Sequence, residues 1–229
     1  MKVKLESLIQ GARNADGTVV VIDVFRAFTT AAVAFSQGAK RVVMVAEVED
    51  ALRLKNEDKG ELCIGEVDGI KPDEFDFGNS PFEISSVDFS GKSVIQSTRA
   101  GTVGINEVRV SNKIYACSLV TAAATAKAIL ADKPDSITIV AMGLNGLERT
   151  DEDEICALYL RNLIRGKTPD INSIKSLILT SADAQRFDDP FLSQYDPRDR
   201  EIALQIDSMS FAITVALEGD LMVAKRVDL

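Results

Sequence analysis

The sequence predicts an α/β fold: a largely parallel sheet with helices on both faces, followed by a C-terminal helical segment and a β-hairpin. Short β-branched runs alternate with longer segments rich in Ala and Leu, which is typical of βαβ units. With 229 residues, 46% of them hydrophobic, the chain can bury a substantial core. We therefore expect a single domain over residues 1–229, with a subdivision near 145–150 as the alternative.

The first part of the chain carries the alternating pattern. Apolar β-branched runs predict strands, and the Ala-rich and Leu-rich segments between them predict helices that cover the sheet. The expected strands are 18–23, 41–46, 62–65, 93–97, 113–116 and 136–141, and the expected helices are 27–37, 47–57 and 120–131.

The second part has a different texture. Segment 151–165 predicts a helix whose acidic first turn suits the positive end of the helix dipole, and 173–185 predicts another. The stretch 188-DDPFLSQYDPRDR-200 carries two prolines and six charges, which favours a surface connection. Segments 210–217 and 221–227 flank 218-EGD-220 and predict a hairpin.

The charge balance bears on partners. With 35 acidic and 26 basic residues the net charge is −9, which argues against a nucleic-acid backbone or an anionic membrane as partner. No run approaches the roughly 20 apolar residues of a membrane helix, and residues 1–10 lack an apolar signal core. Three cysteines without CxxC spacing suit a reducing compartment, so we expect a cytoplasmic protein. A homo-oligomer remains open.

The sequence contains no histidine. Ser-His-Asp and Cys-His catalysis and imidazole metal sites are therefore excluded. Acid–base chemistry must come from other side chains or water, and a catalytic metal would have oxygen ligands. Mg²⁺ is the cofactor that these ligands favour.

Asp23 and Arg26 follow the first predicted strand, in 18-TVVVIDVFRAFTT-30. In a parallel α/β sheet, ligands bind beyond the carboxyl ends of the strands, where helix N-termini also point. The alternative is a helix-capping aspartate beside a solvent-facing arginine. The DxDx[TV] motif of haloacid dehalogenase phosphatases fails here, because Phe25 occupies the position of its second aspartate.

The segment 97-STRAGT-102 follows another predicted strand. Small residues before a helix let backbone amides turn toward one anion, and the hydroxyls of Thr98 and Thr102 and the charge of Arg99 would add to such a site. The segment is not a Walker loop, because GxxxxGK[ST] is absent.

Two further segments bring polar residues to the same predicted edge. The long irregular stretch 65-GEVDGIKPDEFDFGNSP-81 is typical of a functional loop, and its Glu66 directly follows a strand. The acidic stretch 150-TDEDE-154 follows a strand and a glycine-rich loop. Acidic residues at the start of a helix are ordinarily explained by their interaction with the helix dipole. Asp151 is a candidate ligand only because its segment follows a predicted strand end.

Together these segments resemble one family. The combination of 23-DVFRAFTT-30, 65-GE-66, 75-FDFGNSP-81, 98-TRAGT-102 and 151-DEDEICA-157 resembles the 2-phosphosulfolactate phosphatase family, named for an activity of coenzyme M biosynthesis. The similarity extends over nearly the whole chain, to 201-EIALQID-207 and the final hairpin. One departure is that the family pattern TTNGT is replaced by STRAGT, which puts the substrate in doubt more than the reaction.

The resemblance implies an α/β, Mg²⁺-dependent phosphatase that hydrolyses the phosphate ester of a small hydroxy acid, releasing 3-sulfolactate in the named reaction. Asp23 and Arg26 match the first family motif, and Glu66 matches the second. The third motif is matched by Asp76, Gly78, Asn79 and Ser80, and the fourth by Thr98, Gly101 and Thr102.

We therefore hypothesise a site for a small anionic phosphorylated substrate. Asp23 and Glu66 would hold Mg²⁺, with Asp76 or Asp151 completing the oxygen shell. Arg26 and Arg99 would clamp the phosphoryl oxygens, the amides of 98–102 would receive them, and Lys71 would meet the substrate's carboxylate or sulfonate. Asn79, Ser80 and Gly101 complete the substrate-binding set, and Asp23, Arg26 and Glu66 the catalytic set.

Several alternatives remain open at this stage. Asp23 is either a covalent nucleophile or the ligand of a metal that activates water, and we favour water. The substrate could be another phosphorylated 2-hydroxy acid, such as phosphoglycolate or phospholactate. A non-catalytic module that binds an anionic metabolite would need the arginine elements but not Glu66 or Asp76.

Overall fold

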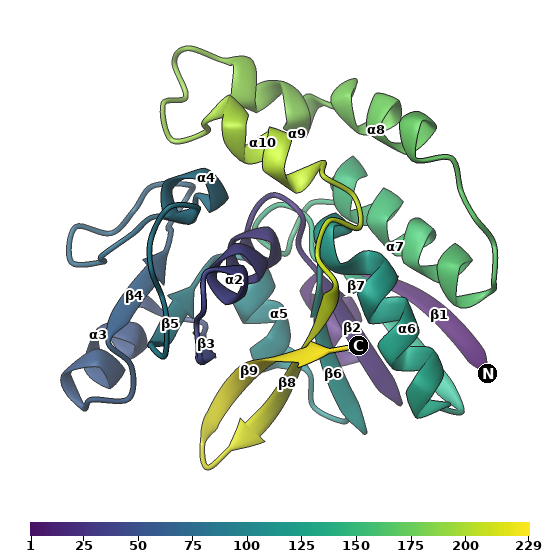
Figure 1. Ribbon diagram of the computed structural model, residues 1–229, viewed down its shortest axis with the longest axis horizontal. Helices are drawn as coiled ribbons and strands as arrows, with labels where there is room; N and C mark the ends of the chain where they lie inside the picture. The colour runs from purple at the N-terminus through teal and green to yellow at the C-terminus, as the bar shows by residue number, and fades with distance from the viewer.

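The computed structural model describes residues 1–229 and confirms the predicted α/β class. Nine strands form one mixed sheet in the order β1-β7-β2-β6-β8-β9-β3-β5-β4 (Figure 1). The strands are β1 Lys2–Ser7, β2 Thr18–Ile22, β3 Arg41–Val45, β4 Leu62–Gly65, β5 Ser93–Ser97, β6 Lys113–Cys117, β7 Ser136–Ala141, β8 Phe211–Glu218 and β9 Leu221–Asp228. All six predicted strands are present, within two residues of the expected bounds.

The C-terminal hairpin lies in the middle of the sheet. Strands β1, β7, β2 and β6 form one parallel block, and β3, β5 and β4 form another. Strand β8 pairs antiparallel with β6, with Tyr115 opposite Thr214, and β9 pairs antiparallel with β3, with Val43 opposite Val223. The hairpin predicted from the sequence therefore joins the two parallel blocks.

Helices cover both faces of the sheet, as predicted. The two blocks curve around α2 and α5, which lie between them in Figure 1. Helices α6 and α7 cover the other face of the first block, and α3 that of the second. The helices are α1 Leu8–Arg13, α2 Ala27–Ser36, α3 Val48–Asn56, α4 Pro81–Ile84, α5 Gly101–Glu107, α6 Ala122–Asp132, α7 Asp151–Ile164, α8 Ile171–Leu179, α9 Ala182–Gln185 and α10 Pro197–Ala203, with 3-10 turns η1 Leu119–Thr121 and η2 Arg186–Asp188.

Helix α2 is buried on nearly all sides. Every residue of AFTTAAVAFS except the last is buried, so the helix has no solvent-facing stripe. Its Ala and Thr side chains are small enough for strands and neighbouring helices to approach from several directions. Because α2 starts at Ala27, directly beyond β2, this packing fixes the position of the strand–helix turn that carries Asp23 and Arg26.

Strand β1 was not predicted. Its sequence KVKLES alternates charged and apolar residues, and the strand lies at the edge of the sheet, where it pairs only with β7. An edge strand can keep charged side chains in solvent, so it lacks the continuous apolar run that marks the interior strands.

The region after α7 differs most from expectation. The helix predicted over 173–185 is divided into α8 and α9, because Ser181 caps α9 by accepting a hydrogen bond from the Ala184 N–H. The segment predicted as a surface connection ends in α10, with Asp196 as its N-cap and Pro197 in its first turn. A proline after an aspartate starts a helix here, and Asp199 is fully buried.

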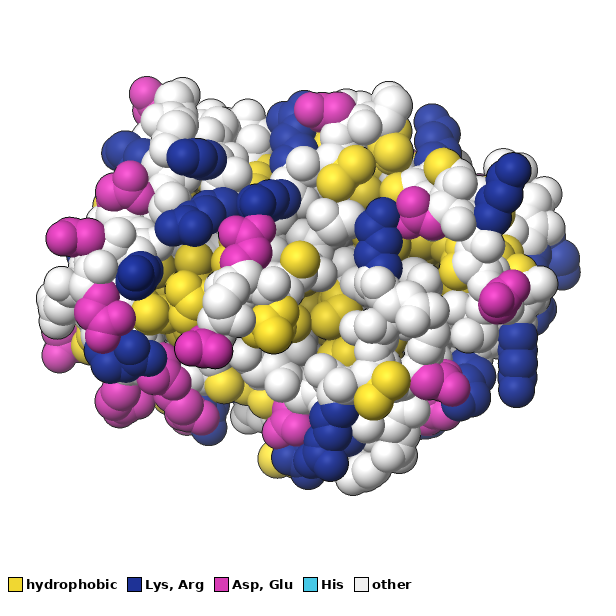
Figure 2. All heavy atoms as spheres, turned by 90° about the horizontal axis from the view of Figure 1, so that it is seen from below, with side chains coloured by type: hydrophobic (Ala, Val, Ile, Leu, Met, Phe, Trp, Pro, Cys, Tyr) yellow, Lys and Arg dark blue, Asp and Glu magenta, His cyan; other side chains and the backbone are white.

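Charges of both signs are mixed on the lower face of the molecule (Figure 2). Lys, Arg, Asp and Glu side chains are interspersed there, with hydrophobic side chains visible between them. No helix combines the length and the apolar character that crossing a membrane would require.

Gly65→Ala tests the turn from β4 into the loop that carries Glu66. Gly65 has a φ of 151°, and an added Cβ would overlap the Ser97 carbonyl oxygen. We expect a loss of at least about 3 kcal/mol in the free energy of unfolding, measured by chemical denaturation. Gly91→Ala is the control: Gly91 has a φ of 74° but no atom within 4 Å of an added Cβ, so only the backbone cost of about 1–2 kcal/mol should appear. Equal losses would contradict the overlap.

Candidate active site

A cleft of about 250 Å³ opens where several parallel strands end. Asp23 follows β2, Glu66 follows β4, and Arg99 and Gly143 lie two residues beyond β5 and β7. The cleft is bounded by these strand ends and by residues from α9 to the segment before α10. Its polar lining consists of Asp23, Arg26, Glu66, Asp68, Asn79, Arg99, Asn145, Thr150, Glu152, Asp183, Arg186 and Tyr195.

The Asp23 carboxylate connects two helix starts. Its Oδ1 accepts a hydrogen bond of 2.9 Å from the Ala27 N–H at the start of α2, and its Oδ2 accepts one of 2.8 Å from the Gly101 N–H at the start of α5. Burial raises the pKa of Asp23 to about 6, although these two amides lower it. The capping interpretation and the functional interpretation therefore both apply, because the same carboxylate holds α2 and lines the cleft.

Glu66 is held by two backbone amides. Its Oε1 accepts a hydrogen bond from the Arg99 N–H at 2.9 Å, and its Oε2 accepts one from the Gly69 N–H at 2.7 Å. These contacts fix the carboxylate at the cleft wall. The hydrogen bond from the Arg99 amide to Glu66 holds the 98–102 loop beside the end of β4.

The 98–102 loop binds acids of the protein itself. The Arg99 and Gly101 amides donate to Glu66 and Asp23, while Thr98 and Thr102 bond to each other and do not line the cleft. In this structure the loop amides therefore hold carboxylates, where the sequence suggested that they would receive phosphoryl oxygens. An added Cβ at Gly101 would lie 2.8 Å from Asp23 Oδ2, so the close approach requires glycine.

Arg26 is buried, in contrast to the solvent-facing arginine of the alternative interpretation. Its Nη1 donates to Asp199 Oδ2 at 2.7 Å and to the Gln194 carbonyl at 2.9 Å. The guanidinium carbon lies 5.1 Å from the centre of the Tyr195 ring, a cation–π distance. Arg26 lines the cleft, as expected for a phosphate-binding residue.

The remaining predicted substrate-binding residues divide between the cleft and a neighbouring hollow of about 550 Å³. Arg99 lines the cleft with its side chain 43% exposed, 3.8 Å from Glu47. Asn79 is buried, lines both spaces, and has an Oδ1 without a hydrogen-bond partner. Lys71 and Ser80 lie only in the neighbouring hollow.

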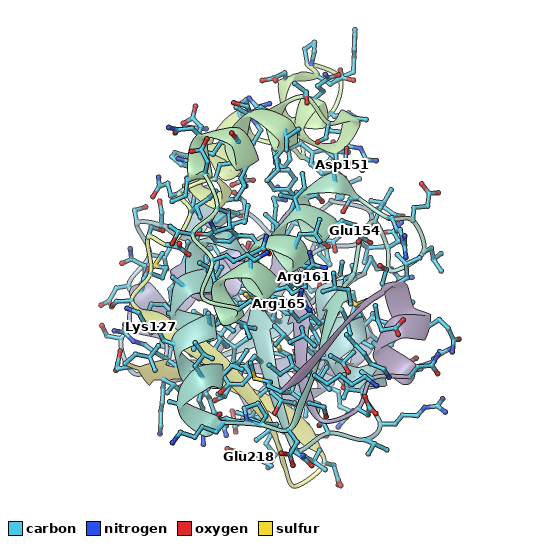
Figure 3. All side chains as sticks on the ribbon, turned by 90° about the vertical axis from the view of Figure 1, so that its right-hand side faces the viewer. Lys127, Asp151, Glu154, Arg161, Arg165 and Glu218 are labelled. Carbon is cyan, nitrogen blue, oxygen red and sulfur yellow. The ribbon has the colours of Figure 1, made fainter.

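Two predicted metal ligands do not reach the cleft. The Asp76 carboxylate bonds at 2.7 Å to both the Lys55 ammonium and the Cys63 N–H, because the irregular segment folds back along β4. Asp151 is exposed at the first position of α7. Figure 3 shows it with Glu154 at one end of the helix and Arg161 and Arg165 toward the other, an arrangement that suits the helix dipole.

The next two residues of α7 are buried acids that were not predicted from the sequence. Glu152 lines the cleft, and its Oε2 is buried without a hydrogen-bond partner. Asp153 accepts bonds from the Val24 and Gly143 amides at 2.7 and 2.8 Å. Glu152 and Asp153 precede the buried Cys156 and Ala157 by one helical turn, and this periodicity could have identified them.

Burial dominates the electrostatics of this end of the cleft. It raises the pKa of Glu152 to about 8 and the pKa of Asp153 well above its ordinary value, and the neighbouring carboxylates raise both further. Asp183, on α9, also has a pKa raised by burial. Neither Asp183 nor Arg186 was selected from the sequence, since their segment gave no strand-end signal.

The oxygen-rich lining is chemically suited to a hard cation. Asp23, Glu66, Asp68, Glu152 and Asp183 supply carboxylate oxygens to the lining, and the Oε2 of Glu152 is buried without a hydrogen-bond partner. However, no three acidic or cysteine side chains are grouped closely enough to hold a metal ion on their own. A cation would need further oxygens from water or a ligand, as Mg²⁺ commonly does.

Comparison with known proteins identifies the same family from a family model and from individual relatives. Residues 4–202 match the family described as 2-phosphosulpholactate phosphatase, a match that ends before the hairpin. Proteins named "Probable 2-phosphosulfolactate phosphatase" are 34% identical over 160 residues in Caldicellulosiruptor saccharolyticus, 39% over 145 in Clostridium perfringens and 37% over 153 in Thermotoga petrophila. The matches cover 68%, 62% and 67% of this chain and 66%, 58% and 65% of those relatives, so the chain spans less than two thirds of their length.

Glu152→Gln should stabilise the metal-free protein at high pH. The buried neutral carboxyl contributes stability that is fully present below its ordinary pKa of 4.5 and is lost as the pH rises through about 8. Glutamine cannot ionise, so the variant should gain on the order of a few kcal/mol over wild type at about pH 9 and little at about pH 5. Thermal unfolding in EDTA across this pH range measures the difference.

Asp151→Asn is the matched control, because it removes a carboxylate from the same helical turn at an exposed position. Its effect on the unfolding temperature should be small at both pH values. A Glu152→Gln difference that does not change with pH would contradict the raised pKa.

Proposed function

The chain belongs to the 2-phosphosulpholactate phosphatase family, and on this basis we propose that it is a phosphatase for the phosphate ester of a small hydroxy acid. The proposed substrate is 2-phosphosulfolactate, and the products are 3-sulfolactate and phosphate. The observation that carries the proposal is the cleft itself, in which Arg26, Arg99 and Arg186 lie with buried carboxylates at the ends of parallel strands. Its volume of about 250 Å³ suits a small molecule.

The arginines supply the charge that an anionic substrate requires. The whole chain has a net charge of −9, so a phosphorylated acid must be attracted locally. Arg26 is buried and fixed, whereas Arg99 is partly exposed and weakly paired. We assign phosphoryl binding to Arg26 and capture of the substrate to Arg99, because a desolvated, fixed guanidinium binds a tetrahedral oxyanion more strongly.

We further propose that the enzyme requires Mg²⁺, held by Glu152 with Asp23 and Asp183, directly or through water. The pKa of Glu152 is raised first by burial and then by the charges of Asp183 and Asp23, and all three side chains line the cleft. When bound, Mg²⁺ would neutralise phosphoryl charge and polarise the scissile bond. Asp76 and Asp151 are not part of this proposal, since neither lines the cleft.

Asp23 is assigned a supporting role toward an attacking water. Both of its oxygens already accept backbone hydrogen bonds, which hold the negative charge in place and reduce its tendency to attack phosphorus. A pKa of about 6 leaves the carboxylate ionised at neutral pH and able to accept a proton. Glu66, whose carboxylate is fixed by two amides, places a second acidic side chain in the wall of the cleft.

A phosphate-release assay tests the proposed reaction. Purified protein would be incubated with 2-phosphosulfolactate, phospholactate or phosphoglycolate, with and without Mg²⁺. We expect Mg²⁺-dependent release that is fastest with 2-phosphosulfolactate, and a loss of at least about 100-fold in Asp23→Asn, because that variant loses a charge central to the cleft.

Asp151→Asn serves as the control, because this exposed acid lies outside the cleft, and it should retain wild-type activity. Preference for another substrate would move the assignment to a different phosphorylated 2-hydroxy acid. Binding of phosphorylated acids without any phosphate release would instead indicate a non-catalytic module.

Arg99→Ala should mainly weaken substrate binding. The exposed guanidinium can attract substrate and transition state alike, so we expect KM to rise about tenfold while kcat changes by less than about twofold. Steady-state kinetics measure both constants. Arg53→Ala, which removes an exposed arginine on α3 that pairs with Asp50 and Glu57, should leave both unchanged. Wild-type constants in Arg99→Ala would remove Arg99 from the site.

A further inference from the structure

Asp199 is a fully buried acid in a segment that the sequence predicts to be on the surface. It lies on α10, with 0% of its side chain exposed. Figure 1 shows α10 above α2 and close to α4. Asp199 does not line the cleft, but its partner Arg26 does.

Each oxygen of the Asp199 carboxylate has a separate role. Oδ2 accepts a hydrogen bond of 2.7 Å from Arg26 Nη1, across 173 positions of the sequence. Oδ1 accepts bonds from the Ser80 hydroxyl at 2.6 Å and the Phe82 N–H at 2.9 Å, at the start of α4. The carboxylate is thus anchored on one side and directed at Arg26 on the other.

These contacts determine which edge of the Arg26 guanidinium stays available. The two Nη1 hydrogens are used by Asp199 and the Gln194 carbonyl. Nη2 has a single contact of 3.4 Å to the Gly69 carbonyl, and Nε has none. The Nε–Nη2 edge therefore retains two roughly parallel N–H donors, the arrangement that binds two oxygens of a phosphate.

Aromatic rings further restrict the guanidinium. The Tyr195 and Phe187 ring centres lie 5.1 and 6.0 Å from its carbon, and the two rings pack edge to face at 5.4 Å. Both rings and Asp199 come from the segment between α9 and the end of α10. A single segment therefore supplies the anion and the aromatic surfaces that orient Arg26.

We propose that Asp199 is a positioning residue: it holds Arg26 so that the Nε–Nη2 edge of the guanidinium faces phosphate in the cleft. The proposal rests on the proposed function in that the phosphate belongs to the substrate or product. It differs from a structural ion pair in one testable respect. The effect of Asp199 on phosphate binding must pass through Arg26.

The test is a double-mutant cycle on inorganic phosphate binding, measured by calorimetry at one fixed Mg²⁺ concentration. Asp199→Asn keeps the size of the side chain but presents an amide to Arg26, and we expect the Kd for phosphate to rise at least about tenfold. Arg26→Ala should raise the Kd by a similar or larger factor. The double variant should bind no more weakly than Arg26→Ala alone, because the positioning effect vanishes without Arg26.

Glu201→Gln is the matched control. It also replaces a carboxylate by an amide of the same size on α10, but Glu201 is exposed and lines neither the cleft nor the neighbouring hollow. Its phosphate affinity should stay within about twofold of wild type.

The outcomes separate this proposal from the proposed reaction. Independent, multiplying effects of Asp199→Asn and Arg26→Ala would overturn it, as would tighter phosphate binding in Asp199→Asn, which would show that the carboxylate competes with phosphate for Arg26. Phosphate binding with the expected cycle but no hydrolysis of any ester would support Asp199 while refuting the phosphatase assignment.

A milder variant keeps the test decisive if Asp199→Asn does not fold. Ser80→Ala removes one hydrogen bond from the Asp199 carboxylate and leaves the ion pair with Arg26 in place. It should weaken phosphate binding by about threefold in the wild-type background and have no effect in Arg26→Ala. An equal effect in both backgrounds would overturn the proposal.

Discussion

The carboxylate of Asp23 is the contact on which the site depends. It accepts hydrogen bonds from the first residues of α2 and α5, which follow β2 and β5. Four strands separate β2 from β5 in the sheet, so their ends can meet only because the sheet curves around the two helices. The Gly101 backbone must come close to the acid, and the absence of a side chain there permits it. Fold and site are thus constrained by the same atoms.

The second constraint is the proximity of like charges in a region of low polarity. Burial is the largest cause of the raised pKa of Asp23, Glu152 and Asp153. Neighbouring acids raise each pKa further: Glu66 acts on Asp23, Asp183 and Asp23 act on Glu152, and Glu152 and Asp23 act on Asp153. Such a group must be protonated, paired with a cation or held by amides. Amides hold both oxygens of Asp23 and Asp153, whereas one oxygen of Glu152 has no partner. Glu152 is therefore the acid that a bound cation would stabilise most.

The sequence predicted those site residues whose positions follow from their neighbours in the chain. Asp23 and Glu66 were found because each directly follows an apolar strand, and strand ends share one edge. Asp151 was selected one position away from the buried Glu152, since acidic composition marks a helix start but only the buried periodicity of α7 shows which acids turn inward. The contact of Asp199 with Arg26 and the central place of the predicted hairpin in the sheet could not be predicted, because these contacts join residues about 100 or more positions apart.

The central place of the hairpin also bears on how the chain reaches its native state. Strands β8 and β9 follow every other strand in sequence, yet they join the two parallel blocks. Until they insert, β6 and β3 present unpaired edges, to which strands of other molecules could bind. Contacts of such long sequence separation form slowly, because a long loop must close before they are gained. Protection of these two edges during synthesis, by a chaperone or by fast collapse around α2, would then govern the yield of folded protein.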